Sequence, residues 1–300
     1  MLQQLNPKNK DIKVYVNGAL LHRDDAKISV FDSVVQGGDA VWEGIRVYDG
    51  RIFHLDHHLE RLQNSAHALD FKAVPTNEII TKAIFDTLEA NGMRDGVHIR
   101  LTLTRGEKIT SGMDPRLNQY GCGLIVLAEW KPPVYPPSIT LATSSVRRNS
   151  PRHLDSKIHH NNLLNNILAK IEANYAGADA GLMLDSEGYI SEANGVNVFC
   201  IRKGKVLTPY ADFCLPGITR GTILELCQKH GIPAEERRLS LTDFYTADEV
   251  FTTGTMGELT RVASIDGREI INKHGSSVLE QVAAYFRTLT ETSGTPIPAF

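Results

Sequence analysis

Alternating apolar and polar residues predict strands early in the chain. IKVYVNG alternates before a turn, and AVWEGIRVYDGRIF contains two strand-like pieces around Asp49-Gly50, a dipeptide favoured in tight hairpins. Apolar residues then recur with helical spacing at about 56–70 and 76–91. VHIRLTLTR and GLIVLAEW follow as strands, so we expect an α+β arrangement in this half of the chain.

The second half of the chain also mixes helical and strand patterns. SITLATSS predicts a strand, Leu154 to Lys170 a helix, and Gly181 to Pro209 a meander with turns at Glu187-Gly188 and Lys203-Gly204. The remaining expected elements are a helix from about Ile218 to His230 that Gly231 ends, strands at EVFTTGT and TRVASIDGREI, and a helix from Ser276 to about Leu289.

Four prolines among residues 132–137, in EWKPPVYPPS, forbid a helix and interrupt any sheet ladder. We therefore expect an interdomain linker at 132–138, between an N-terminal domain of residues 1–131 and a C-terminal domain of residues 139–300.

The stretch LDSKIHHNNLLNNILAK is unusual for a helix. Behind Lys157 it carries an apolar stripe, yet the opposite face is rich in asparagine, where Glu, Gln or Lys would favour both helix and solubility. The stripe is Leu163, Leu164, Ile167, Leu168 and Ile171, and the asparagines are Asn161, Asn162, Asn165 and Asn166. Such a pattern indicates that the lysine and the amides serve a site.

Composition narrows the function. The 300 residues are 42% hydrophobic and 22% charged with a formal net charge of −3, which leaves no overall field to attract nucleic acid or an anionic membrane. The opening MLQQLNPKNK has no apolar core of signal-peptide length, and no apolar run is long enough to span a bilayer. The four cysteines form no CxxC pair, so we expect a cytoplasmic protein with reduced thiols.

Several short motifs fail as sites. GCGLIV lacks the third glycine of a dinucleotide-binding loop, and TRGEKITSG lacks the Gly-Lys-Ser/Thr of a phosphate loop. A metal site would need convergence of His54, His57, His58, His159 and His160. A solvated or hydrogen-bonded helix face explains the first three histidines equally well, so no metal is expected.

Other residues predict an anionic cofactor. Arg61 lies in an apolar stripe that would hold its guanidinium in place, and Pro216-Gly217 precedes a helix whose first N–H groups suit a phosphate. Glu192 lies on a half-buried strand, where a carboxylate needs a partner. Together with the amine of Lys157 and a hydroxyl from TTGT, these are the groups that pyridoxal phosphate requires.

EANGVNVF, VLTP and LPGITR resemble the signature of the class IV aminotransferases, the fold type IV pyridoxal-phosphate enzymes. VWEGIRVYDG, HLDHHLERL, SKIHHNNLLNNILA and ADEVFTTGTMGEL follow in that family's order, so the resemblance covers nearly the whole chain. EGIRVY, LPGITR and GTMGE look most like the branched-chain amino acid aminotransferases. The resemblance implies an α+β fold with a smaller N-terminal α/β domain and a larger C-terminal pseudo-barrel domain that binds the cofactor.

The resemblance also implies roles for individual residues. Lys157 would be the catalytic Schiff-base lysine, and Glu192 would pair with the pyridine nitrogen. The other implied cofactor-binding residues are Arg61, Gly195, Asn197, Ile218, Thr219 and Thr255, and the implied substrate-binding residues are Trp42, Arg46, His98, Arg100, Trp130, Thr255 and Met256. Trp42 and Trp130 are expected to wall an apolar side-chain pocket.

The implied reaction moves the amino group of a branched-chain L-amino acid to 2-oxoglutarate, in a homodimer or higher homo-oligomer whose GEKITSGMDPR loop reaches toward the neighbouring active site. Departures from the branched-chain pattern are Asn162, His98 and Gly37 in place of tyrosines, and Asn194 in place of a small or hydroxylic residue. D-amino acid aminotransferase and aminodeoxychorismate lyase therefore remain alternatives on the same fold. A non-catalytic cofactor carrier and a histidine-based metal-binding protein are the alternatives outside it.

Overall fold

The computed structural model describes residues 3–273 and 275–300, and the chain divides into two compact units. The N-terminal unit comprises the chain up to Pro132 together with Ile158–Asn162 and Thr290–Phe300; the C-terminal unit comprises Pro133–Lys157 and Leu163–Leu289. The first crossing, after Pro132, lies inside the proline-rich segment. The two later returns to the N-terminal unit were not part of the sequence prediction.

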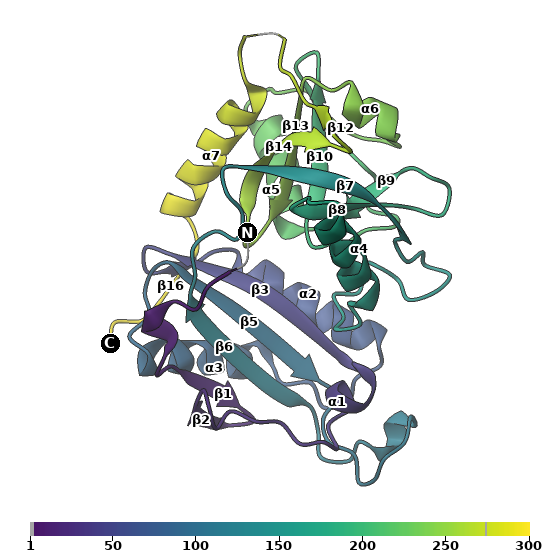
Figure 1. Ribbon diagram of the computed structural model, residues 1–300. Coiled ribbons are helices and arrows are strands. Elements are labelled where there is room, and N and C mark those ends of the chain that lie inside the picture. The colour runs from purple at the N-terminus through teal and green to yellow at the C-terminus, as the bar shows by residue number, and fades with distance from the viewer. Residues whose placement is uncertain (1–2, 274) are drawn as a thin grey trace. The chain divides into compact units, whose positions relative to one another are not determined.

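Within its described residues, the N-terminal unit is built on a seven-stranded sheet in the order β16-β4-β3-β5-β6-β1-β2 (Figure 1). Neighbouring strands in it are antiparallel. The strands are β1 (Lys13–Val16), β2 (Ala19–His22), β3 (Ala40–Tyr48), β4 (Arg51–Ile52), β5 (Val97–Thr104), β6 (Gly123–Trp130) and β16 (Thr295–Pro296). The helices are η1 (Pro7–Asn9), α1 (Ser33–Gly37), α2 (Leu55–Ala68), α3 (Asn77–Ala90) and η2 (Pro115–Leu117).

The two long helices of this unit pack on the sheet, α2 against β3 and α3 against β6 and β1. Side chains alternate between the two faces of a strand, so the residues of β3 that enter the apolar core with these helices, Val41, Ile45 and Val47, share one face. Trp42 and Arg46 consequently lie on the other face of the sheet. Functional side chains from β3 can therefore be assigned to a face by their position alone.

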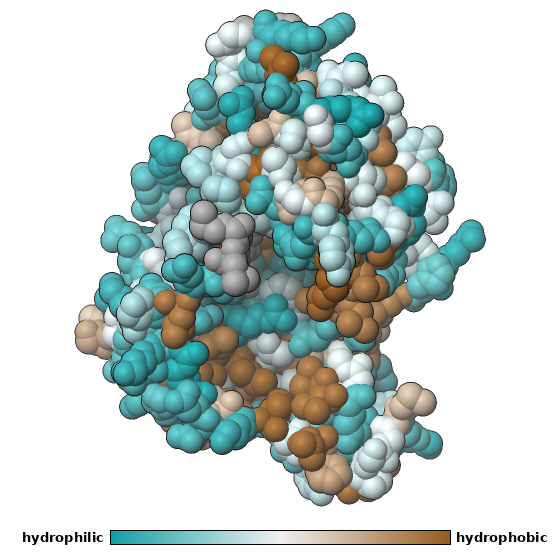
Figure 2. Space-filling model, viewed as in Figure 1, coloured by the Kyte–Doolittle hydropathy of each residue, from teal (hydrophilic) through white to brown (hydrophobic). Residues whose placement is uncertain are grey.

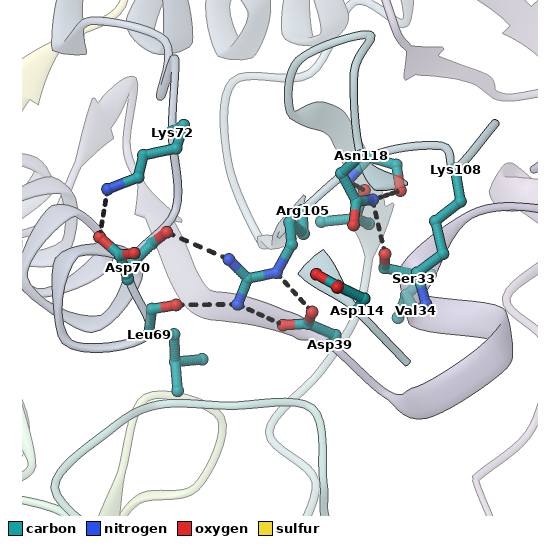
Figure 3. A network of polar contacts seen from close by, with 12 residues as sticks. Ser33, Val34, Asp39, Leu69, Asp70, Lys72, Arg105, Lys108, Asp114 and Asn118 are labelled. Carbon is teal, nitrogen blue, oxygen red and sulfur yellow. Dashed lines mark hydrogen bonds and ion pairs between the residues drawn. The ribbon is translucent and has the colours of Figure 1, made fainter. Parts of the chain in front are cut away.

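Arg105, just after β5, ties the end of α2 to the start of β3 (Figure 3). Its guanidinium forms an ion pair with Asp39 and donates to the carbonyl oxygens of Leu69, at 2.8 Å, and Asp70, at 3.1 Å. Leu69 is the C-cap of α2 and Asp70 follows it, at the end of the helix where carbonyl groups lack partners within the helix. On the same loop, Asn118 donates to Ser33 Oγ at 2.7 Å, which holds the loop beside α1.

The described residues of the C-terminal unit form a larger, mixed sheet in the order β12-β11-β10-β13-β14-β7-β8-β9, with β15 paired to β14. Its strands are β7 (Ser138–Arg147), β8 (Ala180–Leu184), β9 (Ile190–Ala193), β10 (Asn197–Arg202), β11 (Lys205–Thr208), β12 (Ala234–Glu236), β13 (Glu249–Gly254), β14 (Glu258–Ile265) and β15 (Arg268–Glu269). Its helices are α4 (Leu164–Tyr175), α5 (Ile218–Lys229), α6 (Leu241–Tyr245) and α7, which runs from Val278 to Thr292 across the last unit boundary, between Leu289 and Thr290.

Parallel pairing explains where two helices of this unit lie. β7 pairs with β8, and β11 pairs with β12, in parallel. Because parallel neighbours need a crossover connection, α4 connects the first pair and α5 the second. α4 packs against both of its strands, and α5 contacts β12 and β13. The crossover through α5 places the N-terminus of that helix beside the sheet.

The expected helix from Leu154 to Lys170 is wrong in its start. The helix begins only at Leu164, because the preceding residues form turns and an isolated bridge between His160 and Val41. Its apolar stripe is exposed: Leu164, Ile167, Leu168 and Ile171 retain between 42% and 71% of their accessible surface. Asn166, Ala169 and Ala173 face the sheet instead, because only small or amide side chains fit there: a Cβ on Gly181 would lie 2.5 Å from the Ala169 carbonyl oxygen.

Most of the other expected elements are confirmed by the structure. The hairpin at Asp49-Gly50 has both residues at positive φ, 43° and 71°, and the helix that ends before Gly231 runs from Ile218 to Lys229. The short elements α1, α6, β2, β12 and β16 were not predicted. Over the described residues, no helix is long and apolar enough to cross a membrane.

Candidate active site

Glu192 is the buried carboxylate at the centre of the candidate site in the C-terminal unit. It lies on β9, opposite Met183 of β8, and only 5% of its surface is exposed. Arg148 Nε donates to its Oε1 at 2.5 Å, and Asn197 Nδ2 donates to its Oε2 at 3.2 Å. Burial raises the pKa of Glu192, and the Arg148 guanidinium is the strongest influence that opposes this rise. The predicted need of Glu192 for a partner is therefore met by Arg148, which the sequence did not single out.

The N-terminus of α5 lies close to this carboxylate. Asn197 Nδ2 also donates to the Leu215 carbonyl at 2.9 Å. A Cβ atom on Gly217 would lie only 2.1 Å from the Oδ1 atom of Asn197. Only glycine fits this contact. Gly217 is the N-cap of α5 and offers no side-chain cap, so the first N–H groups of the helix, at Ile218 and Thr219, are suited to bind an anion.

A second loop joins the same region. Gly254 ends β13 against the loop before β10: a Cβ on it would meet Val196 Cγ1 at 2.9 Å and the Gly195 carbonyl oxygen at 4.0 Å. This contact brings Gly195 together with the turn that carries Thr255. In that turn, the backbone N–H of Val134, in the proline-rich linker, donates to the Met256 carbonyl at 3.1 Å. The linker therefore fixes the direction of this carbonyl.

Lys157 is the last residue of its segment in the C-terminal unit. It lies in the loop between β7 and α4 with 45% of its side chain exposed, and its Nζ is 3.6 Å from Asp155 Oδ1. Its contacts do not connect it to Glu192 or to the α5 N-terminus. The structure therefore brings together the Glu192 carboxylate and the N-terminus of α5, and leaves the amine of Lys157 on an exposed loop.

Each asparagine that follows Lys157 has an identifiable partner. Asn166 Nδ2 donates to the Asn194 carbonyl at 3.0 Å and so supports the loop after Glu192, and Asn165 donates to Asn149. In the N-terminal unit, Asn162 Nδ2 donates to the Gly38 carbonyl at 2.9 Å. Gly37 and Asn162, which stand where tyrosines were expected, are thus near neighbours.

A buried network in the N-terminal unit surrounds Glu43. Arg61 binds this carboxylate in a bidentate manner, Nε to Oε1 at 2.8 Å and Nη2 to Oε2 at 2.7 Å. His58 Nδ1 lies 2.6 Å from Oε2, and His159 Nδ1 lies 3.1 Å from Oε1. The Glu43 side chain is fully buried, whereas 14% of the Arg61 side chain is exposed.

The electrostatics of this network are set by burial and by Arg61. Burial acts to raise the pKa of Glu43, but His159 and Arg61 outweigh it and hold the pKa well below its usual value. Burial lowers the pKa of His159 to about 4, and it also lowers the pKa of His58. Both rings therefore donate to an ionised carboxylate as neutral imidazoles at pH 7. Sequence reasoning found Arg61 but missed Glu43, its partner.

Four of the expected substrate residues share the face of the N-terminal sheet away from α2. In the register of β3 and β5, Arg46 pairs with His98, and Arg100 pairs with Gly44, which lies between Trp42 and Arg46 on the same face of β3. The Arg100 guanidinium stacks 3.4 Å from the centre of the Trp42 ring, and burial lowers the pKa of Arg100 to about 10. The pKa of His98 is lowered to about 3, mainly by burial and next by the positive charges of Lys131, Arg46 and Arg100.

The expectation that Trp42 and Trp130 wall one pocket is wrong. Trp130 pairs with Val97, and it packs against the apolar core that α2 and α3 cover, on the opposite face of the sheet from Trp42. GLIVLAEW is a nearly continuous apolar run, so its sequence did not reveal which residues face which side.

In the described part of the chain, no group of three or more His, Cys, Asp or Glu side chains is arranged to hold a metal ion. The His54 ring packs against the rings of Phe53 and His57, and His58 and His159 bind Glu43.

Comparison with known proteins agrees with this geometry. The family model described as Amino-transferase class IV matches residues 40–265. The chain belongs to the class IV aminotransferase family. Branched-chain-amino-acid aminotransferase-like protein 2 of Arabidopsis thaliana is 57% identical over 98% of this chain, which spans 53% of that relative's length. A putative branched-chain-amino-acid aminotransferase of Methanocaldococcus jannaschii is 40% identical over 93% of this chain and 96% of its own.

The fold of the family is also confirmed. The crystal structure of the Escherichia coli branched-chain amino acid aminotransferase matches with a TM-score of 0.88 at 30% identity, covering 95% of this chain and 97% of the other. The expected α+β, fold type IV architecture is therefore correct. The chain spans only about half the length of the Arabidopsis thaliana relative, whereas it spans 96% of the length of the Methanocaldococcus jannaschii relative.

Proposed function

We propose that this protein is a pyridoxal-phosphate-dependent aminotransferase that moves the amino group of a branched-chain L-amino acid to 2-oxoglutarate. The observation that carries the proposal is the buried Glu192 carboxylate, linked through Asn197 to an α5 N-terminus without a side-chain cap. Family membership and the names of the relatives support the same reaction.

The residues of the C-terminal unit fit pyridoxal phosphate. The α5 N-terminus suits its phosphate, Glu192 suits its pyridine nitrogen, and the amine of Lys157 suits its aldehyde. Buried polar atoms near Glu192 also lack partners among the described residues, namely Arg148 Nη1, Asn166 Oδ1 and Thr253 Oγ1. Asn166 supports the loop after Glu192 and Thr253 pairs with Asn197, so these atoms belong to the same region. Unpaired buried polar atoms of this kind are expected where a polar ligand binds.

Pyridoxal phosphate, when bound, supplies an electron sink for the bond broken at the substrate Cα. Lys157 would hold the cofactor through its amine and then, as a neutral amine, move the proton at the substrate Cα. Glu192 would keep a proton on the ring nitrogen. Arg61, Gly195, Asn197, Ile218, Thr219 and Thr255 would complete the cofactor site.

For the substrate, we propose that Trp42, Arg46, His98 and Arg100 bind from the open face of the N-terminal sheet, together with Thr255 and Met256. Arg100 is held by stacking on Trp42, and its ring contact leaves the cation available for a carboxylate such as that of 2-oxoglutarate. The C-terminal unit would then form the cofactor-binding domain.

We also propose that the enzyme acts as a homodimer. The exposed stripe on α4, visible as apolar atoms in Figure 2, is too extensive for a helix that faces only water. The loops that follow β2 and β5, together with the short helix α1, expose further apolar residues, Val30, Phe31, Val35, Ile109 and Met113. A second copy of the chain would cover these surfaces.

The thiols support a reducing compartment, and we propose the cytoplasm. Cys122, Cys200, Cys214 and Cys227 are free, and three of them are buried. Burial raises the pKa of Cys200 to about 12 and that of Cys122 and Cys227 to about 11, which keeps them unreactive.

An absorption spectrum followed by a donor screen tests the proposed function. Purified protein mixed with pyridoxal phosphate should develop a visible band that L-leucine, L-isoleucine or L-valine removes in stopped flow. Faster loss with D-alanine or D-glutamate would replace the proposal with a D-amino acid aminotransferase. Release of pyruvate from aminodeoxychorismate would identify the lyase. If the protein binds the cofactor but no amino donor removes the visible band, the protein would be a non-catalytic carrier.

A further inference from the structure

The ion pair between Arg148 and Glu192 is unusual because both charges are buried. Their side chains are each 6% exposed, and the Nε to Oε1 distance is 2.5 Å. Arg148 directly follows β7, and its backbone N donates to the Leu184 carbonyl at 2.9 Å, which fixes the arginine beside the strands that flank Glu192. A buried ion pair contributes little net stability relative to apolar residues, so its presence calls for another explanation.

Arg148 is the strongest influence that favours the ionised form of Glu192. Burial favours the protonated acid, and the contact from Asn197 is a longer, neutral hydrogen bond. Arg220, the other nearby cation, is engaged by Glu236 and by the Pro209 carbonyl. Without the Arg148 charge, Glu192 would tend to take up a proton in this environment.

We propose that Arg148 is a positioning residue for the cofactor ring: it keeps Glu192 as a carboxylate and directs one of its oxygens, so that the ring nitrogen can remain protonated. The inference rests on the proposed function, since it concerns the same ring nitrogen. A protonated Glu192 could not stabilise a pyridinium, and the electron sink would weaken.

Arg148 also has a property that a purely structural arginine would lack. Its Nη1 is buried and has no hydrogen-bond partner among the described residues, while its Nε donates to Glu192. A guanidinium that served only to neutralise Glu192 would be expected to bind both carboxylate oxygens.

The test compares pyridoxal phosphate with its 1-deaza analogue, in which CH replaces the ring nitrogen. Dissociation constants are measured with apoprotein, and the ratio of the analogue's constant to that of pyridoxal phosphate reports the nitrogen contact alone. In the wild type the ratio should be well above one. Arg148→Gln should lower it about tenfold or more, since one pKa unit corresponds to a factor of ten. Arg152→Gln, an exposed arginine on the same loop, is the matched control and should leave the ratio unchanged.

A double variant tests whether Arg148 acts through Glu192. If it does, Arg148→Gln combined with Glu192→Gln should give the ratio of Glu192→Gln alone. Independent effects that multiply, or a wild-type ratio in Arg148→Gln, would overturn the inference and leave the proposed function standing. Failure of the wild type to bind pyridoxal phosphate would overturn both.

Arg148→Lys provides the measurement if the glutamine variant does not fold. A buried lysine loses its charge at lower pH than an arginine. The ratio in Arg148→Lys should therefore resemble the wild type near pH 7 and fall more steeply than the wild type as the pH is raised toward 9. Parallel pH profiles for the two proteins would contradict the inference.

Discussion

The side-chain oxygen of Asn197 lies against Gly217, at a position where a Cβ atom on Gly217 would be 2.1 Å away. Gly217→Ala should therefore displace Asn197 from Glu192 and from the Leu215 carbonyl, and lower the free energy of unfolding by about 1–3 kcal/mol. Affinity for pyridoxal phosphate should fall as well. Gly221→Ala, in the same helix and with open space around it, is the control and should be neutral or stabilising. Equal unfolding midpoints in urea for the two variants would contradict the argument.

Lys157 should form the covalent link to the cofactor. Borohydride reduction of the loaded protein followed by peptide mapping should label residue 157, and Lys157→Ala should abolish transamination. The fold should persist, since the exposed pair with Asp155 contributes at most about 1 kcal/mol. Lys170, which donates to the Asp179 carbonyl at 2.6 Å, is the comparison: a label there would reject the assignment.

Glu43→Gln should be strongly destabilising. The substitution preserves shape but leaves the Arg61 charge without its counter-ion, which typically costs about 3–5 kcal/mol for a buried pair. Urea unfolding at pH 7 measures the effect. Glu60→Gln, exposed on the same helix as Arg61, is the matched control. A loss below about 1 kcal/mol in Glu43→Gln would mean that water reaches the network.

His98 should make stability fall with acid. Its pKa is about 3 in the folded chain against 6.5 for the ordinary side chain, so between these values the unfolded state binds more protons than the folded state. The free energy of unfolding should therefore fall as pH drops below about 6.5, by up to about 1.4 kcal/mol per pH unit for this histidine. His98→Asn should flatten the profile from urea titrations at several pH values, whereas His67→Asn, at an exposed position on α2, should not. Identical slopes for His98→Asn and wild type would remove His98 from this role.

The α4 stripe should mediate self-association. Leu168→Glu places a charge on a side chain that is 49% exposed in the single chain, so it should shift the sedimentation coefficient from dimer to monomer without altering the circular dichroism spectrum. Asn174→Glu, at an exposed polar position of the same helix, should leave the dimer intact. A dimer that survives Leu168→Glu would mean that another surface joins the copies.

Local chemistry explains which features the sequence predicted well. The hairpin at Asp49-Gly50 and the end of α5 before Gly231 depend on residues adjacent in the chain, so turn and cap signals were sufficient. Family motifs predicted Glu192, Asn197 and the α5 N-terminus, which the structure brings together.

Features that depend on distant partners were not predictable in the same way. Glu43 meets Arg61 eighteen positions away and His159 116 positions away, and no local pattern marks such a contact. The α4 stripe had helical spacing, but spacing alone does not tell whether its own chain or another surface covers it. Trp130 lies in a run that is apolar on both faces, so the sequence could not show which face of the sheet it lies on. The register with β5 in the structure shows this face.

The route of the chain after Lys157 has a consequence for how such proteins can be recombined. Lys157 ends a segment of the C-terminal unit, and Ile158 begins one in the N-terminal unit, where His160 bridges to Val41 and the His159 carbonyl accepts from Trp42 N at 2.9 Å. Neither unit is therefore encoded by an uninterrupted stretch of gene. A chimera joined at the proline-rich segment would place the residues after Lys157, from one homologue, against β3 from the other. Exchange of one half of the chain between homologues should therefore disrupt this contact.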